Sequence, residues 1–367
     1  MSEVGEIARL FLRLGATAFG GPAVHIAMLE DEVVRRRSWL SREEFLDLLA
    51  ATNLIPGPNS TEMAIHIGYR RAGWAGFLVA GACFILPAAL IVCGLAAAYV
   101  RFGRLPAAEG LLWGVRPVIV VIVAQALWLL GRSAVRSRPL AILAGAALTL
   151  AAAGVHELML LLGTGLAAAL LAGAIRPRAA AALVPLPLLA SPTATLPGLF
   201  LIFLKIGSVL FGSGYVLLAF LRAELVVRLG WLSESQLLDA VAAGQITPGP
   251  LSTTATFIGF LLRGLPGAGV ATVAIFLPAF VFVALSGPLV PRLRRSKAAG
   301  AFLDGVQVAS LALMAVVTWQ LAIHGVRDPL AALVAVATAV LLLHYRVNAS
   351  WLVLGGAGLG ILRSLTS

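Results

Sequence analysis

Two proline–glycine–proline triplets, each followed by hydroxyl side chains, are the part of this sequence best suited to bind a ligand. The triplets are Pro56-Gly57-Pro58 and Pro248-Gly249-Pro250, and each interrupts an apolar segment. The polar residues that follow them are Asn59, Ser60, Thr61 and Ser252, Thr253, Thr254. A helix that starts there presents free amide donors and a partial positive charge, which suit an anion. The pattern therefore predicts an anion site, with a kink capped by hydroxyls as the alternative.

Ionisable side chains within apolar runs form a second group of candidates, because burying them in a membrane is costly. The cations are Arg13, Lys205 and Arg116. We expect them to bind the anion, with snorkelling to the membrane surface as the alternative. The candidates for proton coupling are Glu32, Glu62, Asp47, Glu224, Asp239 and His25. Structural ion pairs with the cations are the alternative for these carboxylates.

Glycine-rich breaks follow two phenylalanines in equivalent positions. Gly20 and Gly21 come after Phe19, and Gly212, Ser213 and Gly214 come after Phe211. Glycine allows the backbone to approach a ligand or a second helix closely. We therefore count Gly20, Gly21, Gly212 and Ser213 among the candidate substrate-binding residues, with helix packing as the alternative.

These candidates occur twice because the sequence is duplicated. From Phe19 to Thr61 the motif residues have counterparts 192 positions later, as Gly57 has in Gly249. After a one-residue deletion, Leu86-Pro87-Ala88 matches Leu277-Pro278-Ala279. Matched helix breaks in a duplicated membrane domain are typical of transporters built from two repeats. We expect an N-terminal repeat over residues 1–175, a linker over 176–197 and a C-terminal repeat over 198–367.

The composition predicts that the lipid bilayer is the solvent of this chain. Of the 367 residues, 60% are hydrophobic and 12% are charged, and the mean hydropathy is +0.99. Soluble domains average roughly 45–50% apolar and about 25% charged residues. Long apolar runs without strand-like alternation favour helices, so we expect an all-α polytopic protein with two inverted repeats. The helices around each Pro-Gly-Pro triplet form either one broken span or a re-entrant hairpin.

The net charge of +11 does not indicate a nucleic-acid partner. Basic residues gather in short loops such as Arg132–Arg138 and Arg292–Lys297, which is typical of cytoplasmic loops. Arg35–Arg37 fits this pattern poorly. Either it faces outward, or the first apolar segment is broken at Gly20-Gly21-Pro22 and does not cross the membrane.

The sequence contains no motif for a cofactor, a metal or a catalytic nucleophile. Cys83 and Cys93 are the two cysteines, and they lie on one expected helix, too far apart to bridge. No histidine pair has metal-ligand spacing. We therefore expect no cofactor, no metal and no enzymatic activity.

The sequence resembles the chromate ion transporter family in its long, two-domain form. The resemblance rests on Phe19-Gly20-Gly21-Pro22 with His25, on Trp39-Leu40-Ser41, and on Asn53–Pro58 with Gly68-Tyr69-Arg70. In the second half it rests on Phe211-Gly212, Trp231-Leu232 and Thr247-Pro248-Gly249-Pro250. The second copy of the motif differs from the first at two places: it has Ser213-Gly214 where the first has Gly21-Pro22, and Leu251 where the first has Asn59. These differences suggest unequal roles for the repeats.

This resemblance implies a multi-pass protein of the bacterial or archaeal inner membrane that exports chromate and confers chromate resistance. It implies domains of opposite orientation and coupling to the membrane potential or proton gradient, with antiport as the expected mode. The expected partners are chromate or a sulfate-like anion, protons and the bilayer, and a homodimer is left open. A passive anion channel, or a transporter of another oxyanion such as sulfate, is the alternative.

Overall fold

The computed structural model of the chain describes residues 2–103, 105–173, 194–211 and 214–366. These residues contain helices and no β-strand, so the all-α prediction is confirmed. Most of the expected linker, as well as Gly212 and Ser213, lies outside the described residues.

The first repeat contains seven α-helices and one π-helical segment among its described residues. In chain order they are α1 (Glu3–Thr17), α2 (Pro22–Glu30), η1 (Asp31–Arg36), α3 (Arg42–Thr52), α4 (Asn59–Phe102), α5 (Pro106–Ala134), α6 (Arg138–Ala152) and α7 (Glu157–Leu171). Because α1 ends at Thr17 and α2 begins at Pro22, the first segment is broken at the Phe-Gly motif. The break on which the second explanation for Arg35–Arg37 depends is therefore present.

The second repeat follows the same order with shorter elements around its breaks. Its elements are α9 (Leu196–Val209), η2 (Gly214–Val216), α10 (Leu217–Leu221), η3 (Arg222–Arg228), α11 (Glu234–Ile246), η4 (Leu251–Thr253), α12 (Thr254–Arg295), α13 (Lys297–Gly325), α14 (Pro329–Leu343) and α15 (Ala349–Thr366). The π-helical segments η1 and η3 occupy matching positions. Capping boxes start the matching helices α3 and α11, through Ser41 with Glu44 and Ser233 with Gln236.

The helices after the Pro-Gly-Pro triplets are hairpins. α4 is interrupted at Ala72 and Gly73, and α12 at Arg263 and Gly264. Both glycines adopt φ near +60°, which disfavours other residues at the reversal. An added Cβ on Gly68 would clash with the carbonyl of Gly76, although residues eight apart in one helix lie about 12 Å from each other. The chain therefore folds back on itself at Gly73, within the element that follows the Pro-Gly-Pro triplet.

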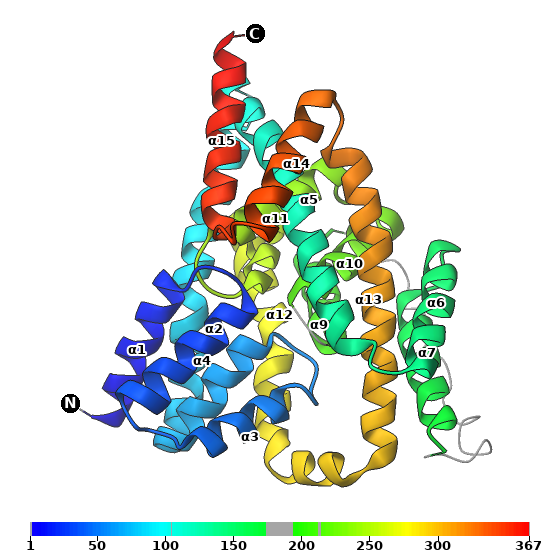
Figure 1. Cartoon of the computed structure of the whole chain (residues 1–367). Coiled ribbons are helices and arrows are strands. Elements are labelled where there is room, and N and C mark those ends of the chain that lie inside the picture. Colours follow the sequence, from blue (N-terminus) through cyan, green and yellow to red (C-terminus); the bar gives the residue numbers. More distant parts are fainter. Residues whose placement is uncertain (1, 104, 174–193, 212–213, 367) are drawn as a thin grey trace.

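The two repeats have opposite orientations. In Figure 1, α4 ends and α5 begins at the top, whereas α12 ends and α13 begins at the bottom. Matching helices thus run in opposite directions, as the inverted-repeat prediction requires.

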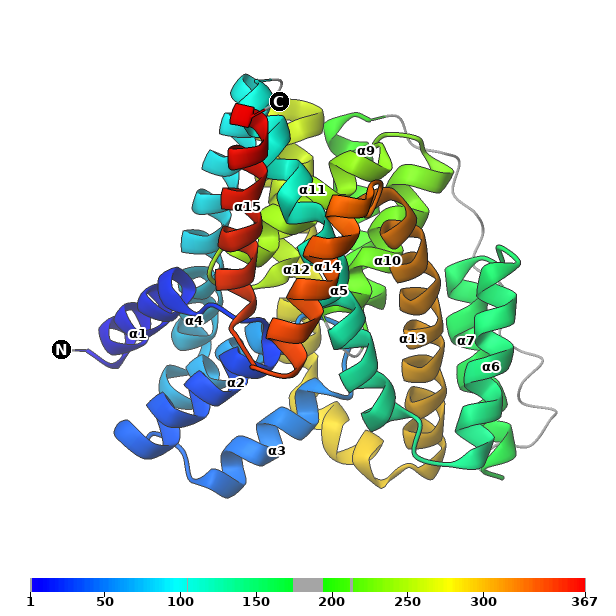
Figure 2. The same cartoon turned by 45° about the horizontal axis from the view of Figure 1, so that its top comes forward.

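Each repeat also packs its last two helices on the other repeat. α6 and α7 pack against α13, and α14 and α15 pack against α5 (Figure 2). Glycines allow the backbones to approach: Gly114 of α5 lies against Gly356 of α15, and Gly305 of α13 lies against Gly165 of α7. The repeats are therefore interlocked rather than side by side.

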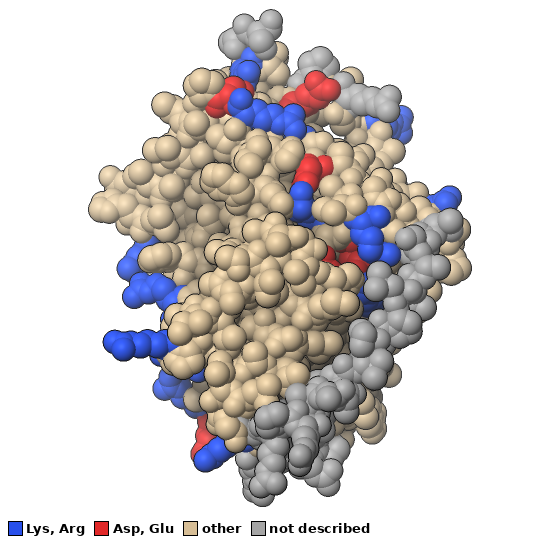
Figure 3. Space-filling view, turned by 90° about the vertical axis from the view of Figure 1, so that its right-hand side faces the viewer, with Lys and Arg blue, Asp and Glu red and all other residues tan. Residues whose placement is uncertain are grey.

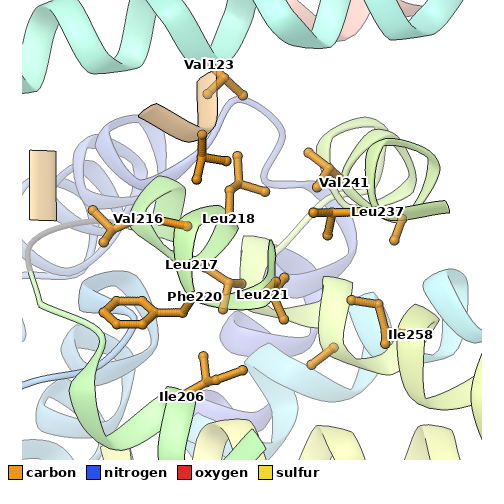
Figure 4. Close-up of a cluster of buried hydrophobic side chains, with 14 of the residues drawn as sticks. Val123, Ile206, Val216, Leu217, Leu218, Phe220, Leu221, Leu237, Val241 and Ile258 are labelled. Atoms are coloured by element: carbon orange, nitrogen blue, oxygen red, sulfur yellow. The ribbon is translucent and has the colours of Figure 1, made fainter. Parts of the chain in front are cut away.

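The hydrophobic core joins the two repeats. Figure 4 shows side chains of α10 surrounded by Ile206 of α9, Val241 of α11, Ile258 of α12 and Val123 of α5. Leu217 and Leu221 are fully buried. Because lipid tails are as apolar as these side chains, close van der Waals packing, and not transfer out of water, stabilises this shared core.

Four helical stretches are long and apolar enough to cross a membrane: Asn59–Phe102, Ala108–Ala134, Leu251–Ser286 and Lys297–Gly325. Shorter apolar helices, including α6, α7, α9, α14 and α15, accompany them. Uncharged residues cover most of the face shown in Figure 3, and many large apolar side chains are exposed. The chain is a multi-pass membrane protein.

We predict that Gly68→Ala lowers stability by about 1–3 kcal/mol, because the new methyl group would overlap the backbone of Gly76. Gly94→Ala is the matched control on the same helix, since a Cβ there meets no atom within 4 Å. The control should be neutral or stabilising by up to about 1 kcal/mol. Thermal unfolding in detergent micelles measures both changes, and equal melting temperatures would contradict the hairpin.

Candidate functional site

The two Pro-Gly-Pro loops are each bound to the other repeat by one backbone hydrogen bond. The Gly57 amide donates to the Leu210 carbonyl at 2.7 Å, and the Gly249 amide donates to the Ala18 carbonyl at 2.9 Å. Both donors and both acceptors are matching positions of the duplication. Each loop thus donates a hydrogen bond to a backbone carbonyl just after the first helix of the other repeat, where that helix breaks and the carbonyl lacks a helical partner.

The Phe-Gly breaks also face each other. A Cβ on Gly21 would lie 3.0 Å from the Tyr215 hydroxyl oxygen, and Pro22 lies beside Gly214. Gly21 therefore serves the close approach of the second repeat, which is the packing explanation. The structure thus brings all four breaks of the chain into contact across the repeats.

The hydroxyls after the first triplet are buried at the start of α4. Ser60 and Thr61 are 3% and 0% exposed, and the Thr61 hydroxyl has no hydrogen-bond partner in the described part of the chain. Asn59 differs, because its amide donates to the Asn53 side chain at 2.8 Å. Thr61 is therefore a free donor at a helix N-terminus.

The matching hydroxyls of the second repeat are equally buried but less free. Thr253 donates to the Pro250 carbonyl and Thr254 to the Leu251 carbonyl, both at 2.8 Å. Ser252 is 1% exposed, and its hydroxyl finds no partner among the described residues. Ser252 and Thr61 are thus the predicted hydroxyls still available to a ligand.

Two of the predicted cations form matching ion-pair clusters. Arg13 lies 2.7 Å from Glu32, which also accepts hydrogen bonds from Arg36 and Arg37. Contrary to expectation, Arg13 is half exposed, with 49% of its side chain accessible. The ion-pairing alternative holds for Glu32.

The second cluster repeats this arrangement at the matching positions. Glu224 is almost fully buried and binds both Lys205 and Arg228. Sequence reasoning did not single out Arg36 and Arg228, although they share the spacing of the repeats and were detectable from it. Ion pairing also holds for Glu224.

Burial alone would raise the pKa of Glu32, but hydrogen bonds and positive charge from Arg13 and Arg37 outweigh it and hold that pKa below its ordinary value. Glu224 also lies near His156 and Glu157, with ligand-capable atoms within 4.8 Å of one another. Two cations already neutralise Glu224, which disfavours a metal ion there.

The third predicted cation, Arg116, forms an ion pair between the two repeats. Arg116 of α5 binds Asp239 of α11 through two hydrogen bonds of 2.9 Å, and the Tyr99 hydroxyl donates to the same carboxylate at 3.0 Å. Asp239 is 2% exposed, whereas its counterpart Asp47 is exposed on α3. No sequence motif marks Tyr99, which has no polar counterpart in the second repeat.

Two cavities open beside these ion pairs. One of about 620 Å³ is lined by Arg13, Glu32 and Arg36, and one of about 610 Å³ is lined by Tyr99, Arg116 and Asp239. Neither lining includes Thr61 or Ser252. The two hydroxyls are therefore buried away from the side chains that line these two cavities.

Two further titratable groups are buried in the first repeat. Glu62 is fully buried, and neither carboxylate oxygen has a hydrogen-bond partner in the described part of the chain. His25 is 2% exposed, and its Nε2 lies 2.9 Å from the Ala18 carbonyl. Burial lowers the pKa of His25 to about 4, against a smaller opposite effect of that hydrogen bond. This neutral imidazole therefore acts as a hydrogen-bond donor to the break.

Comparison with known proteins agrees with this architecture. The sequence model of the chromate transporter family matches residues 5–171 and 198–361. This chain belongs to the chromate transporter family. The match falls in two parts, one on each repeat, which is how the duplicated structure is arranged.

Several relatives are similar over most of their length. The chain is 33% identical to a chromate transport protein of Cupriavidus metallidurans, covering 96% of this chain and 91% of the relative. It is 34% identical to a chromate transport protein of Pseudomonas aeruginosa, covering 85% and 79%. An uncharacterized transporter of Bacillus subtilis, YwrA, is 36% identical over 119 residues, 32% of this chain and 67% of the relative. No solved structure shows significant similarity to this chain.

We predict that Asp239→Ala lowers stability by about 3–5 kcal/mol, because it leaves the Arg116 guanidinium partly buried without its partner. The double variant Arg116→Ala/Asp239→Ala should lose less than the sum of the two single variants. A double-mutant cycle on denaturant unfolding measures the difference. Additive losses would show that the pair does not couple the repeats.

We predict a pH-dependent contribution from Glu32. Its folded-state pKa is depressed, so its stabilisation is present above the ordinary glutamate pKa and is lost as the pH falls through the folded-state pKa. The stability gap between the wild type and Glu32→Gln should be about 1 kcal/mol at pH 7, since Arg13 is half exposed, and should close at low pH. Melting temperatures of both proteins across this pH range measure the gap.

Proposed function

We propose that this protein is a secondary transporter that exports chromate across the bacterial inner membrane, coupled to the proton motive force. The observation that carries the proposal is the pair of free, buried hydroxyls of Thr61 and Ser252. They stand at equivalent helix starts, next to breaks that the two repeats hold together. Inverted repeats with discontinuous helices place substrate sites of transporters at the repeat interface.

The chemistry of these groups suits a tetrahedral oxyanion. Hydroxyl and amide donors at a helix N-terminus stabilise an anion without the desolvation of a buried cation. The candidate cations all bind carboxylates in this conformation, so they offer no free positive charge at the hydroxyls. We propose that Arg13 and Arg116 act at the two cavities, where an entering oxyanion competes with Glu32 or Asp239 for them.

The relatives support chromate as the substrate, since those of Cupriavidus metallidurans and Pseudomonas aeruginosa are named chromate transport proteins. Sulfate has the same shape and charge, so a sulfate transporter is the alternative within this class. A passive anion channel is the alternative mechanism. The burial of Thr61 and Ser252, which line neither cavity, favours a carrier over an open channel.

The decisive experiment measures radiolabelled chromate and sulfate flux in proteoliposomes, with and without an imposed proton gradient or membrane potential. A carrier should show saturable chromate flux that responds to the gradient and is inhibited by sulfate. Flux that saturates weakly and ignores the proton gradient would favour the channel. Absence of both anion fluxes under every gradient would overturn the proposal.

We predict that Thr61→Ala and Ser252→Ala each raise the half-saturating chromate concentration about tenfold or more, because a hydrogen bond to a charged ligand contributes roughly 1.5–3 kcal/mol. Ser133→Ala is the control, since this exposed hydroxyl donates to the carbonyl of its own helix. Concentration-dependent flux in proteoliposomes gives the constants. Wild-type constants in both site variants would place the anion elsewhere.

A further inference from the structure

A polar stripe runs along the first half of the α4 hairpin. Glu62, His66 and Arg70 are spaced by four residues, so they lie on one face of the helix. Glu62 is fully buried, His66 is 8% exposed and Arg70 is exposed. The stripe therefore leads from the buried break of the first repeat to the surface at the turn of the hairpin.

Glu62 differs from Glu32, Glu224 and Asp239 in forming no ion pair with any described residue. Glu32, Glu224 and Asp239 are held in ion pairs, whereas both oxygens of Glu62 lack hydrogen-bond partners in the described residues. Its carboxyl group lies against Gly57 of the Pro-Gly-Pro loop. Burying such a group as a charge is expensive, so its neutral form is the stable one until a partner or water reaches it.

The second repeat does not carry this stripe. The matching residues are Thr254, Phe257 and Leu261, and Phe257 packs against the Tyr99 ring at 5.3 Å. The hairpin of the second repeat thus folds in the same way without ionisable residues on this face. The ionisable stripe of the first repeat is therefore not required by the fold.

Charged and titratable groups on the neighbouring elements have other partners or are exposed. On α1, Glu3 and Glu6 pair with Arg71, and Arg13 pairs with Glu32. The remaining groups, each with its environment, are His25 of α2 at the Ala18 carbonyl, Glu30 of α2 at Arg42, Glu44 of α3 at Ser41, exposed Arg9, Glu43 and Asp47, Asp239 of α11 at Arg116, Glu234 of α11 at Arg222, and Arg263 of α12 at the Ala194 carbonyl.

We propose that Glu62 is the proton site of the transporter and that the proton moves in the same direction as the oxyanion. This inference rests on the proposed function. Glu62 directly follows Thr61, so an anion bound at the first turn of α4 adjoins its carboxyl group. A like charge disfavours the carboxylate, so anion binding and protonation of Glu62 favour each other. Joint movement is symport, the opposite of the antiport expected from the sequence.

His66 serves as the relay between Glu62 and the surface. Its Nε2 lies 3.5 Å from the Ser286 hydroxyl oxygen, whose own proton is donated to the Val283 carbonyl. A neutral imidazole takes up a proton at one ring nitrogen and releases one from the other. In this scheme Glu62 gives its proton to His66, which releases one from its other ring nitrogen, and no other bond changes.

Export remains downhill under this scheme. A dianion that leaves together with one proton carries one net negative charge outward. An inside-negative potential of about 100 mV favours that movement by roughly 2.3 kcal/mol. The membrane potential therefore drives the cycle, while the pH gradient opposes it.

The test follows the internal pH of proteoliposomes, clamped at zero membrane potential, after chromate or sulfate is added outside. Sulfate is included because it binds no proton near neutral pH. For the wild type we expect acidification of the interior together with radiolabelled anion uptake. Alkalinisation would mean antiport and would overturn the inference. If the wild type moved neither anion, the proposed function itself would fail first.

The variants separate the proton site from the anion site. Glu62→Gln should keep anion flux driven by a membrane potential but lose coupled proton flux by about a hundredfold. Glu62→Asp should restore the coupling. His66→Phe, which copies Phe257 of the second repeat, should slow proton movement without changing its direction. Glu43→Gln is the control: Glu43 is exposed, so this substitution should alter neither flux.

Two results would reject the assignment of Glu62. The first is undiminished proton flux in Glu62→Gln. The second is loss of anion flux under a membrane potential in Glu62→Gln that remains monodisperse and melts like the wild type. Both results are distinct from a failure of the wild type to transport.

Discussion

The structure depends on the requirement that broken backbone inside a membrane must find hydrogen-bond partners within the protein. Each unsatisfied amide or carbonyl in hydrocarbon costs several kcal/mol. The chain meets this requirement reciprocally, through Gly57 with Leu210 and Gly249 with Ala18. Neither repeat could hold its own break closed at these points, because the partner always belongs to the other repeat. The repeats also depend on each other through their shared hydrophobic core and through the last two helices of each repeat, which pack on the other repeat.

Within this symmetric frame the chemistry is unequal. The ion-pair clusters of Glu32 and Glu224 are matched, and so are the buried serines. Glu62 and His25 are not, since Thr254 and Leu217 stand in their places. A symmetric scaffold suits alternating access, because two conformations can then be nearly equal in energy. Titratable groups that occur in only one repeat, such as Glu62 and His25, allow proton movement to be coupled to only one of the two halves.

The sequence was sufficient for most of the fold. Composition predicted the all-helical membrane class, the regular offset predicted the repeats, and Ser41 and Ser233 marked helix starts that the structure places at Arg42 and Glu234. The reversal of direction at Gly73 was not predicted, because a glycine beside Arg70 and Arg71 marks the end of one helix without showing the direction of the next. The packing of α6 and α7 on α13, and of α14 and α15 on α5, could not be predicted from the sequence. Apolar helices of similar length do not show which helix they pack against.

For the site, residue types were easier to predict than their neighbours. The cations and carboxylates were identified singly, and the structure joined most of them to one another. Tyr99 escaped notice because a lone tyrosine near a helix end is most simply explained as an interfacial residue. Glu62 was one carboxylate among several until burial and the absence of a described partner separated it from the rest.

The packing of the last helices of each repeat on the other repeat has a consequence for biogenesis. α6 and α7 leave the ribosome long before α13, the helix on which they pack, because the chain between Leu171 and Lys297 must be made first. At roughly 5–20 residues per second this interval is on the order of ten seconds. During that time the small glycine-lined face around Gly165 lacks its partner in the bilayer. Lipid or an insertion chaperone must cover it, so the first half of this protein waits in the membrane for the second half before its structure is complete.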